Sequence, residues 1–189
     1  EEINNFYTVT VYEKGAEVVR MLHTLLGEHD FKQACNNYFN KFDGQAVTTD
    51  DFVSCMESAS SLDLSQFRRW YSQAGTPHVQ LESRYDANAQ TLYLDFSQHT
   101  PDTPQQHDKS AFLIPIKIAL FDADGRRLDF ASGGQVTNET VLHLTKHHQR
   151  FMISNVCSEP HISALRGFSA PIKLEQKQDE DCLILLARF

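Results

Sequence analysis

The sequence is poor in positive charge. Its 189 residues include 17 lysines and arginines against 25 aspartates and glutamates, which gives a formal net charge of −8 at pH 7. Proteins that bind nucleic acids rely on Lys and Arg to neutralise phosphates and release counterions. An acidic chain of this kind therefore argues against nucleic acid as a partner.

The sequence also lacks a long hydrophobic run. Its most apolar segment, from Ala111 to Phe121, is interrupted by Pro115 and Lys117. It also falls short of the roughly 20 apolar residues that a membrane-spanning helix needs. We therefore expect no membrane partner.

Cysteine is scarce and widely spaced. The four cysteines form no C-x-x-C pair, so the sequence predicts neither a zinc ribbon nor a dense disulfide framework. They are Cys35, Cys55, Cys157 and Cys182. We interpret them as reduced thiols of a cytoplasmic protein.

Typical start signals are missing as well. The first residues, EEINNFYTVTV, contain no initiator Met, no basic segment and no apolar signal core. At the other end, QDEDCLILLARF places acidic residues before an apolar run, as a helix start does, and then stops. We therefore expect the chain to be an excerpt from a longer polypeptide.

The first part of the chain has helical periodicity. Residues 8–12 alternate as a strand would, and apolar residues then recur at helical spacing. Phe67, Trp70 and Tyr71 are interpreted as core residues of the last of these helices. Four helices are expected: from Tyr12 to Gly27, from Asp30 to Asp43-Gly44, after the capping arrangement Thr48-x-x-Asp51, and from about Asp63 to Gly75.

Beyond Pro77 the apolar period changes to two, which is typical of strands. The fold class predicted is α+β, with an N-terminal helical segment followed by an antiparallel immunoglobulin-like β-sandwich. The loop from Thr100 to Ser110 is rich in Pro, Gln and Asp, so we expect it to be mobile and surface-exposed. The expected strands are VQLES, TLYLDFSQ, FLIPIKIALFD, TVLHLTK and FMISNV, with turns at YDANAQ and DADGR.

Histidine is the residue type to test for metal binding. His143 and His147 have the spacing of a zinc-protease helix, but Leu144 stands where such a helix carries its glutamate. The surrounding residues alternate like a strand, which would hold the two histidines too far apart to chelate one metal. Exposed histidines at a strand end are the better interpretation.

Tyr12 lies where the expected strand meets the expected helix. A side chain at such a junction is held by both elements and can still face an open cleft, which suits a catalytic group. The alternative is a packing role, because tyrosines are commonly half-buried at the ends of elements.

Three stretches resemble a known family, the bacterial aminopeptidase N enzymes, which are zinc-dependent alanyl aminopeptidases of the gluzincin class. NNFYTVTVYEKGAEVVRM is similar to the stretch after their zinc site, FRRWYSQAGTP to the end of their catalytic domain, and FSAPIKLE to the exit from their small β-sandwich. The similarity runs over essentially the whole chain in the same order. It implies three parts: residues 1–77 from the catalytic domain, 78–175 as a β-sandwich linker, and 176–189 as the start of a C-terminal helical domain.

The resemblance also implies a reaction and the residues that serve it. In the family, Tyr-x-Lys-Gly-Ala carries a tyrosine whose phenol donates a hydrogen bond to the tetrahedral intermediate, and Tyr12 matches it. Asn4 and Tyr7 match positions that line the pocket for the substrate's N-terminal side chain. The parent enzyme would be a zinc aminopeptidase that cleaves N-terminal residues from peptides with broad specificity, favouring alanine.

The sequence departs from the family in what it omits. The G-A-M-E-N segment and the H-E-x-x-H helix are absent, so we expect no zinc ligands here and no activity from this chain alone. The remaining domains of the same polypeptide are then expected partners. The alternative is a free-standing, non-catalytic β-sandwich interaction module, in which Tyr12 packs and the Thr100 to Ser110 loop is a binding edge.

Overall fold

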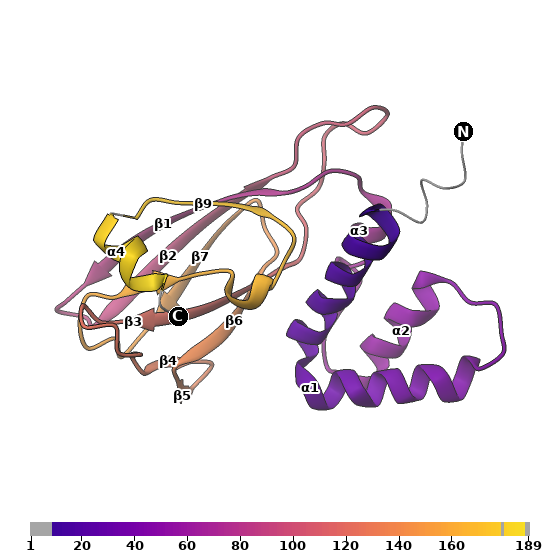
Figure 1. Ribbon diagram of the computed structural model, residues 1–189, viewed down its shortest axis with the longest axis horizontal. Coiled ribbons are helices and arrows are strands. Elements are labelled where there is room, and N and C mark those ends of the chain that lie inside the picture. Colours follow the sequence, from indigo (N-terminus) through magenta and orange to yellow (C-terminus); the bar gives the residue numbers. More distant parts are fainter. Residues whose placement is uncertain (1–8, 179, 188–189) are drawn as a thin grey trace.

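The structure is a computed structural model that describes residues 9–178 and 180–187. A helical region comes first, a β-sandwich follows, and a short helix lies at the far end (Figure 1). The helical elements are a π-helical turn Val9–Lys14, α1 Gly15–Phe42, α2 Thr49–Ala59, α3 Arg69–Ser72, a 3₁₀ turn Arg166–Phe168 and α4 Glu180–Leu186. The strands are β1 His78–Asp86, β2 Thr91–His99, β3 Ile114–Phe121, β4 Phe130–Ser132, β5 Gln135–Thr137, β6 Glu139–Leu144, β7 His148–Ile153, β8 His161–Ser163 and β9 Lys173–Gln176.

The first described residues are helical, so the strand expected before Tyr12 is wrong for them. Val9–Lys14 forms a π-helical turn that runs directly into α1. Valine and threonine favour strands by propensity, but a strand needs a neighbour to satisfy its backbone groups. A helical turn satisfies them within the segment. Tyr12 therefore lies in a turn that continues the helix.

Helix α1 consists of two arms that meet at Gly27. This glycine has φ 77° and ψ 168°, and the two arms run at a steep angle to each other (Figure 1). The expected ends at Gly27 and at Asp43-Gly44 are confirmed. The expected start at Asp30 is wrong, because the second arm begins directly after Gly27. The Asp30 carboxylate instead lies 2.9 Å from His29 Nδ1.

The next two helices differ in how well their starts were predicted. The capping box before α2 is confirmed: Asp51 N donates to Thr48 Oγ1 at 3.3 Å, and Thr48 N donates to the Asp51 carboxylate at 2.9 Å. Helix α3 is much shorter than expected, since Asp63 does not start it. The Asp63 carboxylate accepts from Ser65 N at 2.8 Å, a local turn that competes with helix.

The strands form two main sheets, with strand orders β7-β2-β1-β9 and β6-β3-β8, and a small β4-β5 hairpin. The α+β architecture with a β-sandwich is confirmed, and all five expected strands are present. Four short strands, β4, β5, β8 and β9, were not expected. The pair β1-β9 is parallel, with His78 opposite Lys173, whereas the other pairs between described strands are antiparallel.

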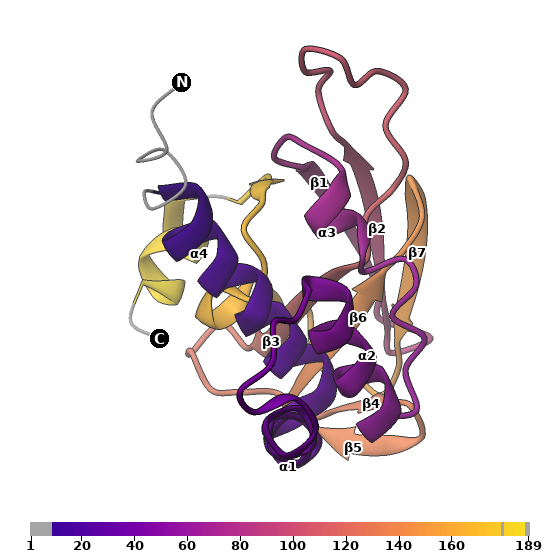
Figure 2. The same ribbon diagram turned by 90° about the vertical axis from the view of Figure 1, so that its right-hand side faces the viewer.

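The helical region is joined to the sandwich by side chains of α3 and by the residues that lead into β3. Trp70 is buried; its Nε1 donates to the Leu113 carbonyl at 2.8 Å, and its ring lies 4.4 Å from that of Phe112. The Gln73 amide makes two 2.9 Å hydrogen bonds to the backbone of Ser110. The backbone groups of Ser110 and Leu113 lie before β3 and are not part of a strand, so these side chains supply their hydrogen bonds. The helical region and the sandwich are packed against each other at this point (Figure 2).

Candidate functional site

Tyr12 is exposed on the π-helical turn. Its accessible fraction is 63%, although large aromatic residues are usually mostly buried. The turn is continuous with α1, so the helix fixes the position of the Tyr12 backbone. A phenol in this position is accessible to a ligand and can donate a hydrogen bond.

Lys14 lies in the same turn and reaches across to the end of the helical region. Its Nζ donates to the Gly75 carbonyl at 3.3 Å, a contact between residues 61 positions apart. The side chain is half-buried. Burial, reinforced by the nearby positive charge of Lys109, lowers the pKa of Lys14. The ammonium is therefore held in a specific place rather than free in solvent.

Gly75 and its neighbour are in turn held by the β2–β3 loop, residues 100–110. Lys109 Nζ donates to the Ala74 carbonyl at 2.8 Å, and Ala74 N donates to Gln106 Oε1 at 2.7 Å. Gly75 has φ 101°, and a Cβ there would lie 2.8 Å from Thr100 Cγ2. Most of the loop is exposed, as expected, but two of its side chains are anchored to residues 72–75.

A groove of about 890 Å³ begins at Lys14, two residues after Tyr12. All three helices of the helical region and Gln106 of the β2–β3 loop contribute to its lining. Its walls are largely apolar, with Val18, Val19, Tyr38, Val47, Phe52 and Tyr71 among them. Apolar surface that is exposed in this way is typical of a face that another segment or a ligand covers.

Asn4 and Tyr7 lie outside the described residues. Their assignment to the pocket for the substrate's N-terminal side chain stays a prediction.

The described residues do not fit a catalytic zinc site. Among them, no group of three or more His, Cys, Asp and Glu side chains is placed to hold a metal ion. His147 is exposed, with its Nδ1 3.2 Å from the Gln98 carbonyl oxygen. The expectation of exposure is wrong for His143, which is half-buried on β6, where burial lowers its pKa.

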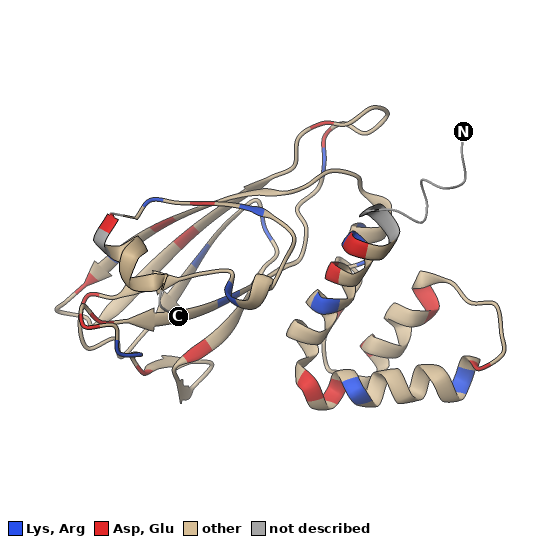
Figure 3. Cartoon of the chain, in the orientation of Figure 1, with Lys and Arg blue, Asp and Glu red and all other residues tan. Residues whose placement is uncertain are grey.

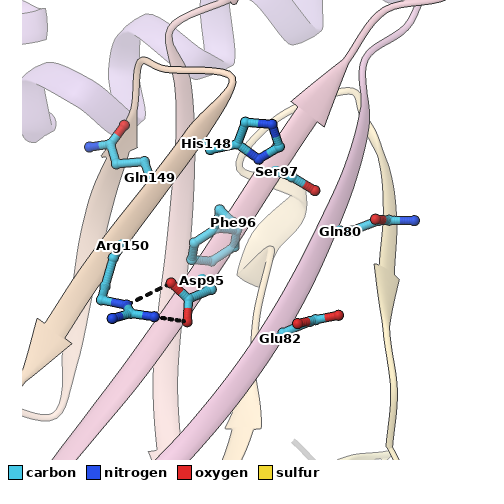
Figure 4. A pocket seen from close by; sticks show the side chains of 8 residues that line it. All are labelled: Gln80, Glu82, Asp95, Phe96, Ser97, His148, Gln149 and Arg150. Atoms are coloured by element: carbon cyan, nitrogen blue, oxygen red, sulfur yellow. Dashed lines mark hydrogen bonds and ion pairs between the residues drawn. The ribbon is translucent and has the colours of Figure 1, made fainter.

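A second hollow, of about 460 Å³, lies on the open face of β1, β2 and β7 (Figure 4). It contains a bidentate ion pair in which Arg150 donates to both oxygens of the Asp95 carboxylate, at 2.7 and 3.0 Å. This hydrogen bonding lowers the pKa of Asp95. Exposed pairs of this kind contribute little to stability, and the carboxylate is already engaged. The arrangement is typical of a solvated sheet face.

The distribution of charge marks neither region as a polyanion-binding surface. Acidic and basic residues are interspersed along α1 and over the strands, and α2 carries only acidic ones (Figure 3). None of the described helices is both long and apolar enough to span a membrane.

Lys14 is the residue that sequence reasoning overlooked. It lies in the π-helical turn that continues into α1, and its hydrogen-bond acceptor is 61 positions away. Local patterns in the sequence carry no signal for a contact at that distance.

Two family models match successive parts of the chain. Residues 1–71 match the peptidase family M1 domain. Residues 75–177 match the domain of unknown function (DUF3458) with an Ig-like fold, and this match covers more than half of the chain. The change from one model to the other falls close to Gly75, where the helical region ends.

Individual relatives agree with these matches. Aminopeptidase N of Escherichia coli (strain K12) is 49% identical over 187 residues, covering 99% of this chain and 21% of that protein. Aminopeptidase N of Haemophilus influenzae is 47% identical over 188 residues, covering 100% of this chain and 22% of that protein. The crystal structure of Legionella pneumophila aminopeptidase A in complex with aspartic acid superposes with a TM-score of 0.84 at 26% identity, covering 100% of this chain and 20% of that one.

The chain thus spans about a fifth of the length of these relatives. The resemblance to aminopeptidase N is confirmed along the whole chain. It rests on the helical region and the sandwich together, since each matches its own family model in the order seen in the fold. The chain belongs to the family of the DUF3458 domain with an Ig-like fold, which is joined here to a segment that matches the peptidase family M1 domain.

Proposed function

We propose that this chain is part of a zinc-dependent aminopeptidase that removes N-terminal residues from peptides with broad specificity. The observation that carries the proposal is Tyr12, an exposed phenol at the start of α1, in a chain 49% identical to an aminopeptidase N over 187 residues. The chain would supply one side of the active site and the sandwich that supports it. The division into residues 1–77, 78–175 and 176–189 is part of the same proposal.

In this proposal Tyr12 stabilises the transition state of peptide hydrolysis. Attack of water on the scissile carbonyl puts negative charge on the carbonyl oxygen, and a phenol O–H directed at that oxygen donates a hydrogen bond to it. A donor that is fixed in place before the reaction costs no reorganisation when the charge develops. Continuity of the π-helical turn with α1 supports such a fixed position.

The other components would come from outside the described residues. The zinc ion and its ligands do not fit this part of the chain, so we assign it no metal-dependent step. Asn4 and Tyr7 would contact the N-terminal side chain of the substrate. We also propose a cytoplasmic location, which is supported by the free thiols of Cys35, Cys55 and Cys157.

The alternative is a non-catalytic interaction module. In that case Tyr12 would serve packing, and the β2–β3 loop would be a binding edge. The anchoring of that loop to Ala74 favours a structural role for it over a free binding edge. The exposure of Tyr12 likewise favours a ligand-directed role over packing.

The experiment is the substitution Tyr12→Phe in the full-length enzyme. It removes the hydroxyl and retains the ring, so kcat/KM for an alanine anilide should fall by roughly a hundredfold or more, the loss typical of one oxyanion donor. Zinc content and thermal stability should stay near those of the wild type. The chain alone, incubated with zinc and the same substrate, should release no product above background.

Tyr93→Phe is the matched control, because it removes a hydroxyl from a tyrosine on the open sheet face. It should leave kcat/KM unchanged. If Tyr12→Phe also retains near-normal kcat/KM, the catalytic assignment of Tyr12 fails. Turnover by the chain alone, after contaminating peptidases have been removed, would contradict the division of the active site between this chain and the rest of the enzyme.

A further inference from the structure

We propose that Lys14 is a positioning residue for Tyr12, and that the β-sandwich acts on the active site through it. The inference rests on the proposed function of Tyr12. It starts from one contact: Lys14 Nζ ties the turn that carries Tyr12 to the carbonyl of Gly75, at the junction with the sandwich.

The turn needs an external tie because of its geometry. Val9–Lys14 is π-helical, a rare form that occurs mostly as a single turn and often at functional sites. The π-helical turn departs from the α-helical hydrogen-bond pattern that follows it in α1, so its register differs from that of the helix it joins. The Lys14 side chain supplies a long-range constraint two residues after Tyr12, on the same turn.

The acceptor of this tie is itself fixed. Gly75 lies three residues before β1, and the approach of Thr100 Cγ2 to within 2.8 Å of a Cβ position leaves no room for a side chain there. Lys109 and Gln106 hold the adjacent Ala74 through its carbonyl and its N–H. The β2–β3 loop therefore fixes the position of residues 74 and 75. The hydrogen bond from Lys14 to Gly75 then fixes the turn relative to them.

The charges around Lys14 indicate that it is not there for the local stability of α1. Lys109 places a second cation near Lys14, and the two positive charges repel each other. Burial adds a desolvation cost for the ammonium. Glu17, in the first turn of α1, pairs with Arg20 at 3.2 Å. The Lys14 ammonium therefore lies in an electrostatically unfavourable place, and its hydrogen bond goes to the Gly75 carbonyl at the junction.

The expected consequence is a loss of alignment rather than a loss of substrate binding. A displacement of about 1 Å in a catalytic group can cost up to a hundredfold in rate. Lys14→Met keeps the apolar stem and removes the donor. In the full-length enzyme it should lower kcat by about tenfold with little change in KM. Lys14→Arg, which can still donate to Gly75, should restore most of the rate.

Lys32→Met is the matched control, because Lys32 is an exposed lysine on the second arm of α1. It should leave kcat unchanged. The decisive measurement is a double-mutant cycle with Tyr12→Phe. If Lys14 acts only by placing the phenol, Tyr12→Phe/Lys14→Met should be about as slow as Tyr12→Phe alone. Amide hydrogen exchange over residues 9–14 should be faster in Lys14→Met and unchanged in Lys32→Met.

The outcomes separate this inference from the function it rests on. Near-normal kcat in Tyr12→Phe defeats the role of Tyr12 itself. A slow Tyr12→Phe with wild-type kcat in Lys14→Met, or losses that multiply in the double variant, overturns only the positioning role of Lys14. If Lys14→Met does not accumulate as folded protein, Lys109→Met loosens the anchor without touching the turn. It should then lower kcat in the same direction, and a wild-type kcat there would overturn the proposal.

Discussion

The helical region and the β-sandwich bury their apolar residues in different ways. In β3, at the centre of its sheet, every position except Lys117 is buried. In the helical region, Tyr12 and Phe39 are more than 60% exposed, and the apolar groove is open between the helices. The sandwich also exposes single apolar side chains, Val136, Met152 and Phe168, so the difference is the groove, which leaves a continuous apolar surface that a further segment can cover.

The same contrast holds for polar groups. The sandwich holds an internal ion cluster in which Glu139 pairs with Lys117 at 2.6 Å and with Arg166 at 3.0 Å. The helical region directs several polar side chains outward to the sandwich, as Gln66 and Gln73 do. The helical region therefore depends on contacts with the sandwich for its geometry, and the buried cores of the two regions are continuous.

Trp70→Ala is expected to weaken the contact between the helical region and the sandwich most. The indole packs on Phe112 and donates to the Leu113 carbonyl, so its removal leaves both a cavity and an unsatisfied buried acceptor. The free energy of unfolding should fall by about 3–5 kcal/mol, measured by urea denaturation of the chain. Trp70→Phe, which keeps an aromatic ring but not the donor, should cost less than half as much. Equal losses would show that packing at the junction contributes little.

The second test concerns the ion pairs that Glu139 makes within the sandwich. Burial raises the pKa of Glu139, but its hydrogen bonds to Lys117 and Arg166 outweigh this effect, so the pKa is lowered overall. A depressed pKa stabilises the fold above the pKa of the unfolded chain, near 4.5, and this stability is lost as pH falls through the folded pKa. Glu139→Gln should therefore cost about 1–3 kcal/mol at pH 7 and progressively less below pH 4.5.

The measurement for Glu139→Gln is the unfolding free energy of both proteins across pH 3 to 7. Glu175→Gln, a more exposed carboxylate on β9, is the control and should show little pH-dependent difference. A constant difference between wild type and Glu139→Gln at all pH values would contradict the electrostatic explanation.

The smallest expected effect concerns the local stability of the helical region. Thr48→Ala removes the side-chain acceptor of the capping box and should lower the free energy of unfolding by about 1 kcal/mol. Thr49→Ala, one residue later, keeps the cap and should change it by less than about 0.5 kcal/mol. Equal effects of the two substitutions in thermal denaturation would show that the capping box does not stabilise α2.

Much of the fold follows from local patterns that act over a few residues. The capping box at Thr48 and the turn at Gly27 were predictable because the residues that make them are adjacent in sequence. Period-two alternation likewise identified the long strands. The short strand β9 was not predictable, because its four residues alternate too briefly and pair with a partner far away in the chain.

The candidate site was predictable only in part. Tyr12 could be singled out from its junction and from the family resemblance, but its turn was assigned to the wrong secondary structure. β-branched residues beside it favoured a strand, and the tertiary position overrode that preference. The contact of Lys14 with Gly75 depends on how the chain folds back over 61 positions, and local patterns carry no information about such a distance.

The parallel pairing of β1 with β9 has a mechanical consequence. The chain enters the sandwich at the start of β1 and leaves it at the end of β9, and four pairs from His78↔Lys173 to Leu81↔Gln176 join the two strands side by side. Because the strands run the same way, tension applied at the two ends of the sandwich would slide one along the other. All their hydrogen bonds would then carry the load together instead of opening one after another. Helices α1 and α4, which flank the sandwich at opposite ends, would thus be kept apart by a spacer that resists stretching (Figure 1).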